Sequence, residues 1–270
     1  MHLSWLVLCI PALCTTLCTA QQQCRPAIRT DRKPQVFVMS DINNEPDDTM
    51  SFIRLLVHAD QYDITGLVAI TSIWLNQTTY ADLIVETVRA YGSVVDNFNT
   101  HSAGEFPTEE YLASLVTSGP EACGTDGIRG STLSSGSELL ISVVDGMPDD
   151  GILFCTAWEG INMLAETLSY ISRTRPQLEI DRFVARLRIY SISDQDNAGP
   201  WIRANFPQIA YIVSLHGFNQ YGLATWTGIS GEMMYSGSGD GGPDSSLVTE
   251  EYIARNFQLG PLGSLYPDVV

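Results

Sequence analysis

The chain has 270 residues, of which 44% are hydrophobic, and a formal net charge of −17 at pH 7. A chain of this length can bury a large core, and we expect one α/β domain rather than two small ones. The acidic balance argues against nucleic acid and anionic membrane surfaces as partners, because no cluster of Lys or Arg offsets it.

The first 20 residues predict a secretory signal peptide. Residues 3–13 are an almost unbroken apolar run, too short to span a bilayer, and a small-residue cleavage site ends at Ala20. We therefore expect a secreted, extracellular protein with a linker at residues 21–33. In an oxidising compartment Cys24 and Cys123 are the plausible disulfide pair, with Cys155 a buried thiol.

Strands alternate with helices in the remaining residues, 34–270. Apolar runs predict strands at residues 36–39, 64–70, 151–155, 187–192 and 209–215, and helical spacing predicts helices at residues 47–59, 79–91, 161–171 and 249–256. This alternation predicts an α/β fold, with a Rossmann-like, mainly parallel sheet flanked by helices. Residues 97–146 are less regular, and there we expect irregular connections and two shorter helices.

The turn after the first predicted strand carries four carboxylates within eight residues: Asp41, Glu45, Asp47 and Asp48. Ligands bind at the carboxyl ends of parallel strands, and oxygen ligands this close together suit Ca²⁺ or Mg²⁺. The alternative is an ordinary helix start, with Pro46 in the first position and acids near the helix dipole. That alternative leaves Asp41 and Glu45 unexplained, because close carboxylates repel one another unless a cation or a proton intervenes.

The later strands also end in polar or aromatic residues, which converge on one edge of a parallel sheet. Amide, carboxylate and indole side chains together suit a sugar, whose hydroxyls need hydrogen bonds and whose apolar face stacks on rings. The candidates for substrate contact are Asn43, Trp74, Asn76, Trp158, Asn162, Asp194, Asp196 and Trp201, and Glu159 is a further polar residue after the third long strand. Asn76 also begins the sequon Asn76-Gln77-Thr78, and glycosylation there would require an exposed loop outside the pocket.

These motifs carry a family resemblance. The stretch from Asp41 to Asp48 resembles the N-terminal acid motif of nucleoside hydrolases. More closely, residues 34–268 resemble the nucleoside-hydrolase-like domain of a secreted family described as cellulose-binding. The stretches that match this closer family are WEGINMLA (158–165), LRIYSISDQD (187–196), WTGIS (226–230) and GPLGSLYP (260–267), whereas LVAITS (67–72), continuing to Asn76, resembles the second strand and sugar-contacting asparagine of nucleoside hydrolases.

The resemblance implies a Ca²⁺ ion held by Asp41 and Asp48, and a water activated by Asp47 or Glu45 for attack at an anomeric carbon. The chain departs from the motif at Asn43, where nucleoside hydrolases have an aspartate that binds the metal and acts as general base. The resemblance also implies a further acid beyond Val270, so we expect the domain to be incomplete at its C-terminal end.

Two functions therefore remain open. One is a secreted hydrolase of N-glycosyl or related sugar compounds, which the retained carboxylates favour. The other is a catalytically inactive carbohydrate- or cellulose-binding domain on the same fold, which Asn43 favours. In both cases the expected partner is a carbohydrate or a nucleoside-like small molecule, and the sequence is also compatible with a homo-oligomer.

Overall fold

The computed structural model describes residues 32–130, 132–214 and 249–268. The helices and strands of these ranges belong to one compact unit that begins at Lys33. The predicted signal peptide, Cys24 and the WTGIS stretch lie outside the described residues, so the predictions made for them remain predictions. Within the described ranges, no helix is long and apolar enough to cross a membrane.

The core of the fold is a six-stranded sheet in the order β3-β2-β1-β4-β5-β6, in which each neighbouring pair is parallel. The strands are β1 (Gln35–Ser40), β2 (Asp63–Ala69), β3 (Val116–Ser118), β4 (Leu153–Ala157), β5 (Leu187–Ser191) and β6 (Ala210–Val213). The predicted parallel α/β sheet is confirmed, and β3 is the one strand of the sheet that the sequence analysis missed. The strand order reverses between β1 and β4, which makes this pair the switch point of the sheet.

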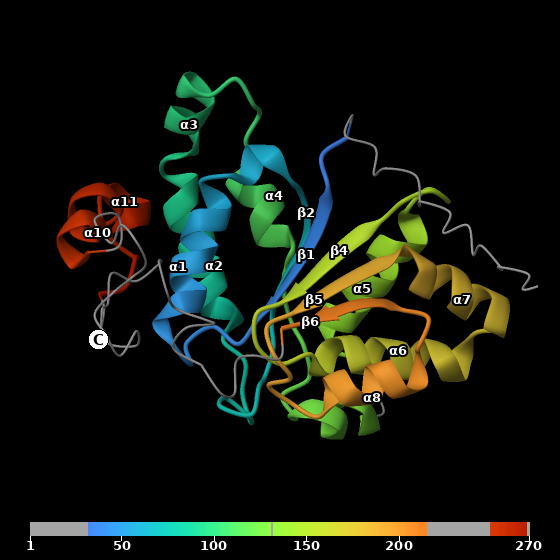
Figure 1. Cartoon of the computed structure of the whole chain (residues 1–270). Coiled ribbons are helices and arrows are strands. Elements are labelled where there is room, and N and C mark those ends of the chain that lie inside the picture. Colours follow the sequence, from blue (N-terminus) through green and yellow to red (C-terminus); the bar gives the residue numbers. More distant parts are fainter. Residues whose placement is uncertain (1–31, 131, 215–248, 269–270) are drawn as a thin grey trace, which may run out of the picture. The chain divides into compact units, whose positions relative to one another are not determined.

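Helices cover the sheet from two sides, as Figure 1 shows. One apolar cluster joins Val36 and Val38 to α1 (Pro46–Leu56) and α2 (Ala81–Gly92). A second cluster joins Phe37 and Met39, from the opposite face of β1, to the helices of the other layer. That layer consists of α5 (Ser135–Gly146), α6 (Asn162–Thr174), α7 (Gln177–Arg186) and α8 (Ala198–Asn205). Successive side chains of β1 therefore pack alternately into two apolar cores, as expected for a central strand that is buried on both faces.

Shorter elements fill the connections. They are α3 (Val95–His101), α4 (Glu109–Ser114), α10 (Glu250–Asn256), α11 (Gly260–Gly263) and the 3₁₀ helices η1 (Ala59–Gln61) and η2 (Gly124–Arg129). Residues 97–146, where two shorter helices were expected without bounds, contain most of α3 and all of α4 and α5. The sequence pattern gave no bounds for α5, the longest of the three.

Helix α1 begins as the sequence predicts. Pro46 occupies its first turn together with Asp47 and Asp48, and Met50, Ile53 and Leu56 are buried against the sheet. Pro fits this position because its missing N–H would have no partner inside the helix. The helix-start interpretation is therefore correct for these residues, but it does not account for the other acids that surround them.

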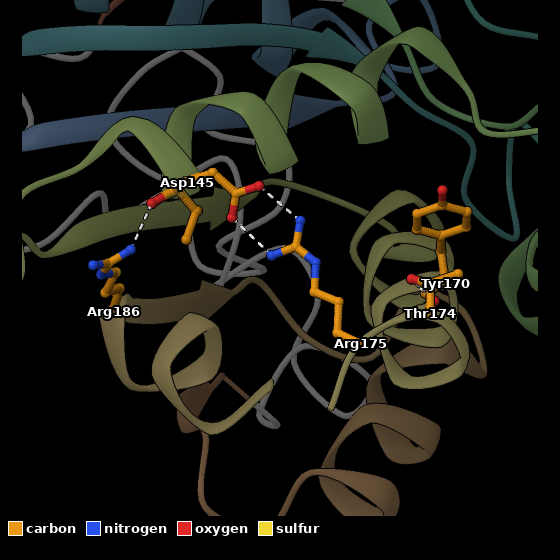
Figure 2. A network of polar contacts seen from close by, with 6 residues as sticks. Asp145, Tyr170, Thr174, Arg175 and Arg186 are labelled. Carbon is orange, nitrogen blue, oxygen red and sulfur yellow. Dashed lines mark hydrogen bonds and ion pairs between the residues drawn. The ribbon is translucent and has the colours of Figure 1, made fainter. Parts of the chain in front are cut away.

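A polar network ties the end of α5 to α6 and α7 (Figure 2). Arg175 Nη1 and Nη2 donate to the two oxygens of Asp145, each at 2.7 Å, and Arg186 Nη1 donates to the Val144 carbonyl at 2.9 Å. Because α5 ends just before β4 begins, this network lies toward the amino ends of the strands. A neighbouring hollow of about 480 Å³ is lined by residues of α5 and α6, and no predicted site residue lines it.

Candidate functional site

The candidate site lies at the carboxyl ends of β1 and β4. In the parallel pairing Met39 is opposite Ala157, and the Trp158 amide donates to the Met39 carbonyl at 2.9 Å. The turn that begins at Asp41 and the loop that contains Glu159 therefore leave the sheet side by side. In open α/β sheets the crevice at such a switch point is the usual ligand site.

Two carboxylates of the first turn are buried and anchored by serines. Asp41 is 2% exposed and Asp48 is 4% exposed. Asp41 Oδ2 accepts a hydrogen bond from Ser72 Oγ at 2.5 Å, and Asp48 Oδ2 accepts one from Ser40 Oγ. Each serine hydroxyl therefore fixes one carboxylate, and Ser72 brings the loop after β2 to the acid turn.

Three further carboxylates meet beside them. One oxygen each of Glu45, Asp47 and Glu159 lies within 4.8 Å of the other two. Glu45 and Asp47 are half-buried, whereas Glu159 is 2% exposed. Glu159 Oε2 is buried and has no hydrogen-bond partner among the described residues. Buried carboxylate oxygens normally have hydrogen-bond partners. The lack of a protein partner for this atom in the described part of the chain therefore indicates that a ligand binds here.

The electrostatics of the cluster agree with this view. Burial, reinforced by the charges of Asp47 and Glu45, raises the pKa of Asp41 to about 7 even though the Ser72 hydrogen bond lowers it. Burial and the neighbouring carboxylates raise the pKa of Glu159 to about 11 and hold the pKa of Asp48 well above its usual value. All three shifts favour the protonated acid, so a cation or protons must compensate the cluster.

The donor set fits a hard divalent cation. Ca²⁺ binds about six to eight oxygen atoms, mainly from carboxylates, carbonyls and water. The cluster offers carboxylate oxygens from the turn after β1, the start of α1 and the loop after β4, and Glu159, which has an unsatisfied Oε2, contributes one of them.

Four of the predicted substrate residues remain candidates. Trp74, Asn43 and Asn76 are exposed to a ligand, and Trp158 lies close to the acid turn. Trp74 is 57% exposed, and its indole N–H donates to Gln195 Oε1 at 2.8 Å. Asn43 and Asn76 are exposed, and Asn43 has a backbone φ of 86°. Trp158 is half-buried, with its ring centroid 4.8 Å from that of Phe52.

The other four bind parts of the protein instead. The Asn162 amide is fully buried and donates to Thr71 Oγ1 and to the carbonyls of Pro120 and Ala122, at 2.7 to 2.9 Å. Asp196 accepts hydrogen bonds at 2.8 Å from the backbone amides of Ile161 and Ala198. These contacts hold loops in place, so the positions of Asn162 and Asp196 do not support substrate binding.

Asp194 and Trp201 also have structural surroundings. Asp194 forms a bidentate ion pair with Arg203, at 2.8 and 2.7 Å. Trp201 is partly buried against the α5–α8 core, with its ring centroid 6.0 Å from that of Phe206. Among the described residues, no contact links Asp194 or Trp201 to the carboxylate cluster.

The structure adds residues that the predicted site lacks. Glu159 joins the carboxylates, Ser40 and Ser72 anchor two of them, and Gln195 fixes Trp74. Glu159 and Gln195 each follow a predicted strand, so their place at the carboxyl edge was a usable signal. Ser40 and Ser72 follow the predicted strands 36–39 and 64–70, so their position carried the same signal. The sequence does not show which carboxylate each serine binds.

A family model described as cellulose-binding Sde182, nucleoside hydrolase-like domain, matches residues 35–270. The chain belongs to this family. The match confirms the resemblance drawn from the sequence.

One solved structure is similar to the chain. It is that of a nucleoside hydrolase-related hypothetical protein from Saccharophagus degradans that is associated with carbohydrate metabolism. The two share 30% sequence identity with a TM-score of 0.73, over 88% of this chain and 52% of that one. This chain therefore spans about half the length of that protein. A comparison with curated proteins finds no match.

Proposed function

We propose that this domain is a metal-assisted hydrolase of glycosyl bonds, acting on N-glycosyl or related sugar compounds. The observation that carries the proposal is the convergence of five carboxylates at the switch point, three of them buried. Such a cluster costs folding free energy, and the recognition of a neutral sugar does not need it. Groups arranged at this cost are typical of catalytic sites.

In this proposal Asp41 and Asp48 hold a Ca²⁺ ion. When bound, the ion would supply the positive charge that lets the surrounding carboxylates ionise and that favours deprotonation of a water. Ser72 and Ser40 keep the two carboxylates oriented through their hydrogen bonds.

Asp47 and Glu45 are the candidates for general base. Both are half-buried, so a water can reach them while they remain in the carboxylate cluster. The base takes a proton as the water oxygen bonds to the anomeric carbon, and the glycosyl bond breaks with its electron pair leaving on the departing group. The amide of Asn43 cannot accept a proton in this way.

A second candidate is carbohydrate binding without cleavage. It is favoured by Trp74, which is 57% exposed and is hydrogen-bonded to Gln195 through its indole N–H, and by the amide at Asn43. The description of the family as cellulose-binding supports a carbohydrate partner in either case.

Product analysis separates the two candidates. The full chain is incubated with nucleosides and with cello-oligosaccharides, with Ca²⁺ or with EDTA, and products are followed by chromatography. We expect Ca²⁺-dependent cleavage that falls about 100-fold or more in Asp47→Asn. The control is Glu86→Gln, which changes an exposed acid of α2. Binding of cello-oligosaccharides in calorimetry, without cleavage of any substrate, would establish the second candidate instead.

A further inference from the structure

Glu159 is a buried acid whose surroundings differ from those of a structural glutamate. The comparison is Glu166 in α6, which is also buried, at 6% exposure. Glu166 accepts hydrogen bonds from the Ser134 amide at 3.2 Å, from Ser137 Oγ at 2.6 Å and from Ser134 Oγ. Glu159 is more buried, yet its Oε2 has no hydrogen-bond partner, and it forms no ion pair with any described residue.

The carboxyl group that carries this unsatisfied oxygen lies among other carboxylates. A Glu159 oxygen is within 4.8 Å of one from Glu45 and one from Asp47. Glu45 ends the turn that follows the neighbouring strand β1, and Asp47 is in the first turn of α1. The charges of Asp41 and Asp48 also act on it. Without a ligand this arrangement brings like charges together out of water, which is unfavourable.

We propose that Glu45, Asp47 and Glu159 together bind the Ca²⁺ ion of this site, with Glu159 as the ligand contributed by the β4 loop. The inference rests on the proposed function, because it concerns the same cation that Asp41 and Asp48 hold. It changes the composition of the site: the ion bridges the β1 and β4 loops. Carboxylates from both loops fit Ca²⁺, which accepts many oxygen ligands in flexible geometry, better than Mg²⁺, which retains most of its waters.

Calcium titration of the full chain tests the assignment. The protein is stripped with EDTA, and Ca²⁺ binding is measured by calorimetry for the wild type, Glu159→Gln, Glu45→Gln and Asp48→Asn. Terbium luminescence gives an independent readout, since Trp158 is next to Glu159 and can sensitise a lanthanide at this position. We expect one ion per chain, bound at least tenfold more weakly by Glu159→Gln and Glu45→Gln.

Two controls separate a lost ligand from a disturbed fold. Glu86→Gln removes an exposed carboxylate from α2 and should leave Ca²⁺ affinity unchanged. Glu166→Gln disturbs a buried carboxylate outside the cluster and should lower thermal stability without changing affinity. If Glu159→Gln unfolds, Glu159→Asp, which retains the charge on a shorter side chain, replaces it and should again weaken binding.

The outcomes distinguish this inference from the proposed hydrolase. If Glu159→Gln binds Ca²⁺ like the wild type while Asp48→Asn does not, the assignment of Glu159 is overturned and the hydrolase proposal stands. If Glu159→Gln loses Ca²⁺ but the wild type cleaves no substrate, the cation site stands and the hydrolase proposal fails. A wild type that binds no Ca²⁺ would overturn both the assignment and the metal-assisted chemistry.

Discussion

Replacing Glu159 with glutamine should change how the stability of the cation-free protein depends on pH. The carboxyl group of Glu159 is buried among other acids. Its pKa is raised from 4.5 to about 11, mainly by burial and further by the charges of the neighbouring carboxylates. Between about pH 5 and about pH 8 the folded protein therefore keeps a proton on Glu159 that the unfolded chain has lost. Glutamine matches the neutral acid in shape and cannot ionise.

The size of the effect follows from proton linkage. The folded state binds one more proton than the unfolded state, so this group makes the free energy of unfolding fall as pH rises. The slope is about 1.4 kcal/mol per pH unit, or about 4 kcal/mol from about pH 5 to about pH 8. Asp41, whose pKa is raised to about 7, contributes in the same direction, but it does so in the wild type and in the variant alike.

Urea unfolding, followed by tryptophan fluorescence in EDTA, measures this difference. The wild type should lose about 4 kcal/mol more than Glu159→Gln across this pH range, and the two should be closest in stability at the acidic end. Parallel pH profiles for the two proteins would refute the reasoning, because they would mean that Glu159 ionises in the folded state as easily as in the unfolded chain. Added Ca²⁺ should flatten the wild-type profile, since the cation replaces the proton as the compensating charge.

Three other predictions concern the loops around the carboxylates. Gly160→Ala should destabilise the protein by about 1 to 3 kcal/mol in urea unfolding, because a Cβ there would lie 2.2 Å from the Thr71 carbonyl oxygen. Gly146→Ala, where a Cβ meets no atom within 4 Å, should cost far less. Trp74→Ala should weaken cello-oligosaccharide binding in calorimetry with little change in melting temperature, since the ring is largely exposed; equal affinity would exclude stacking on Trp74. Asn162→Ala should lower stability by about 2 to 3 kcal/mol in the same urea assay, because the Pro120 carbonyl loses its amide donor and the Ala122 carbonyl keeps only the weaker bond from Thr71 Oγ1, at 3.4 Å; an unchanged midpoint would contradict that.

The elements of the fold were predictable wherever a buried segment has a continuous run of apolar residues in the sequence. Strands β1, β2, β4 and β5 are buried on at least one face, and their apolar runs identify them. Strand β3 has three residues, all half-buried, which is too short for a periodic signal. The bounds of helix α5 were not predicted because it begins in a stretch rich in Ser and Gly. There a Cβ on Gly136 would lie 2.7 Å from Val68 Cγ1, so the glycine permits close packing of helix on sheet and does not mark a flexible turn.

The candidate site was predictable in position but not in the direction of each side chain. A polar residue after a parallel strand lies at the carboxyl edge, where it can contact either a ligand or the backbone of a neighbouring loop. Asn162 and Asp196 contact the backbone, because the loops at this edge leave amides and carbonyls that need buried partners. Trp74 is exposed even though its indole N–H donates to Gln195 Oε1. The residue type alone does not show whether such a side chain contacts a ligand or the backbone of a neighbouring loop.

Glu159 shows why the strand order matters more than the motif. In the sequence it is one polar residue among several that follow strands, far from the acids at Asp41 to Asp48. Only the adjacency of β1 and β4 brings the two loops together, and it is the same adjacency that creates the switch point. If β4 lay at the edge of the sheet, Glu159 would be an exposed loop acid and the turn after β1 would have to compensate its own charges. The cation site that we propose is therefore a consequence of topology: neither loop holds enough ligands alone, and the sheet places one beside the other.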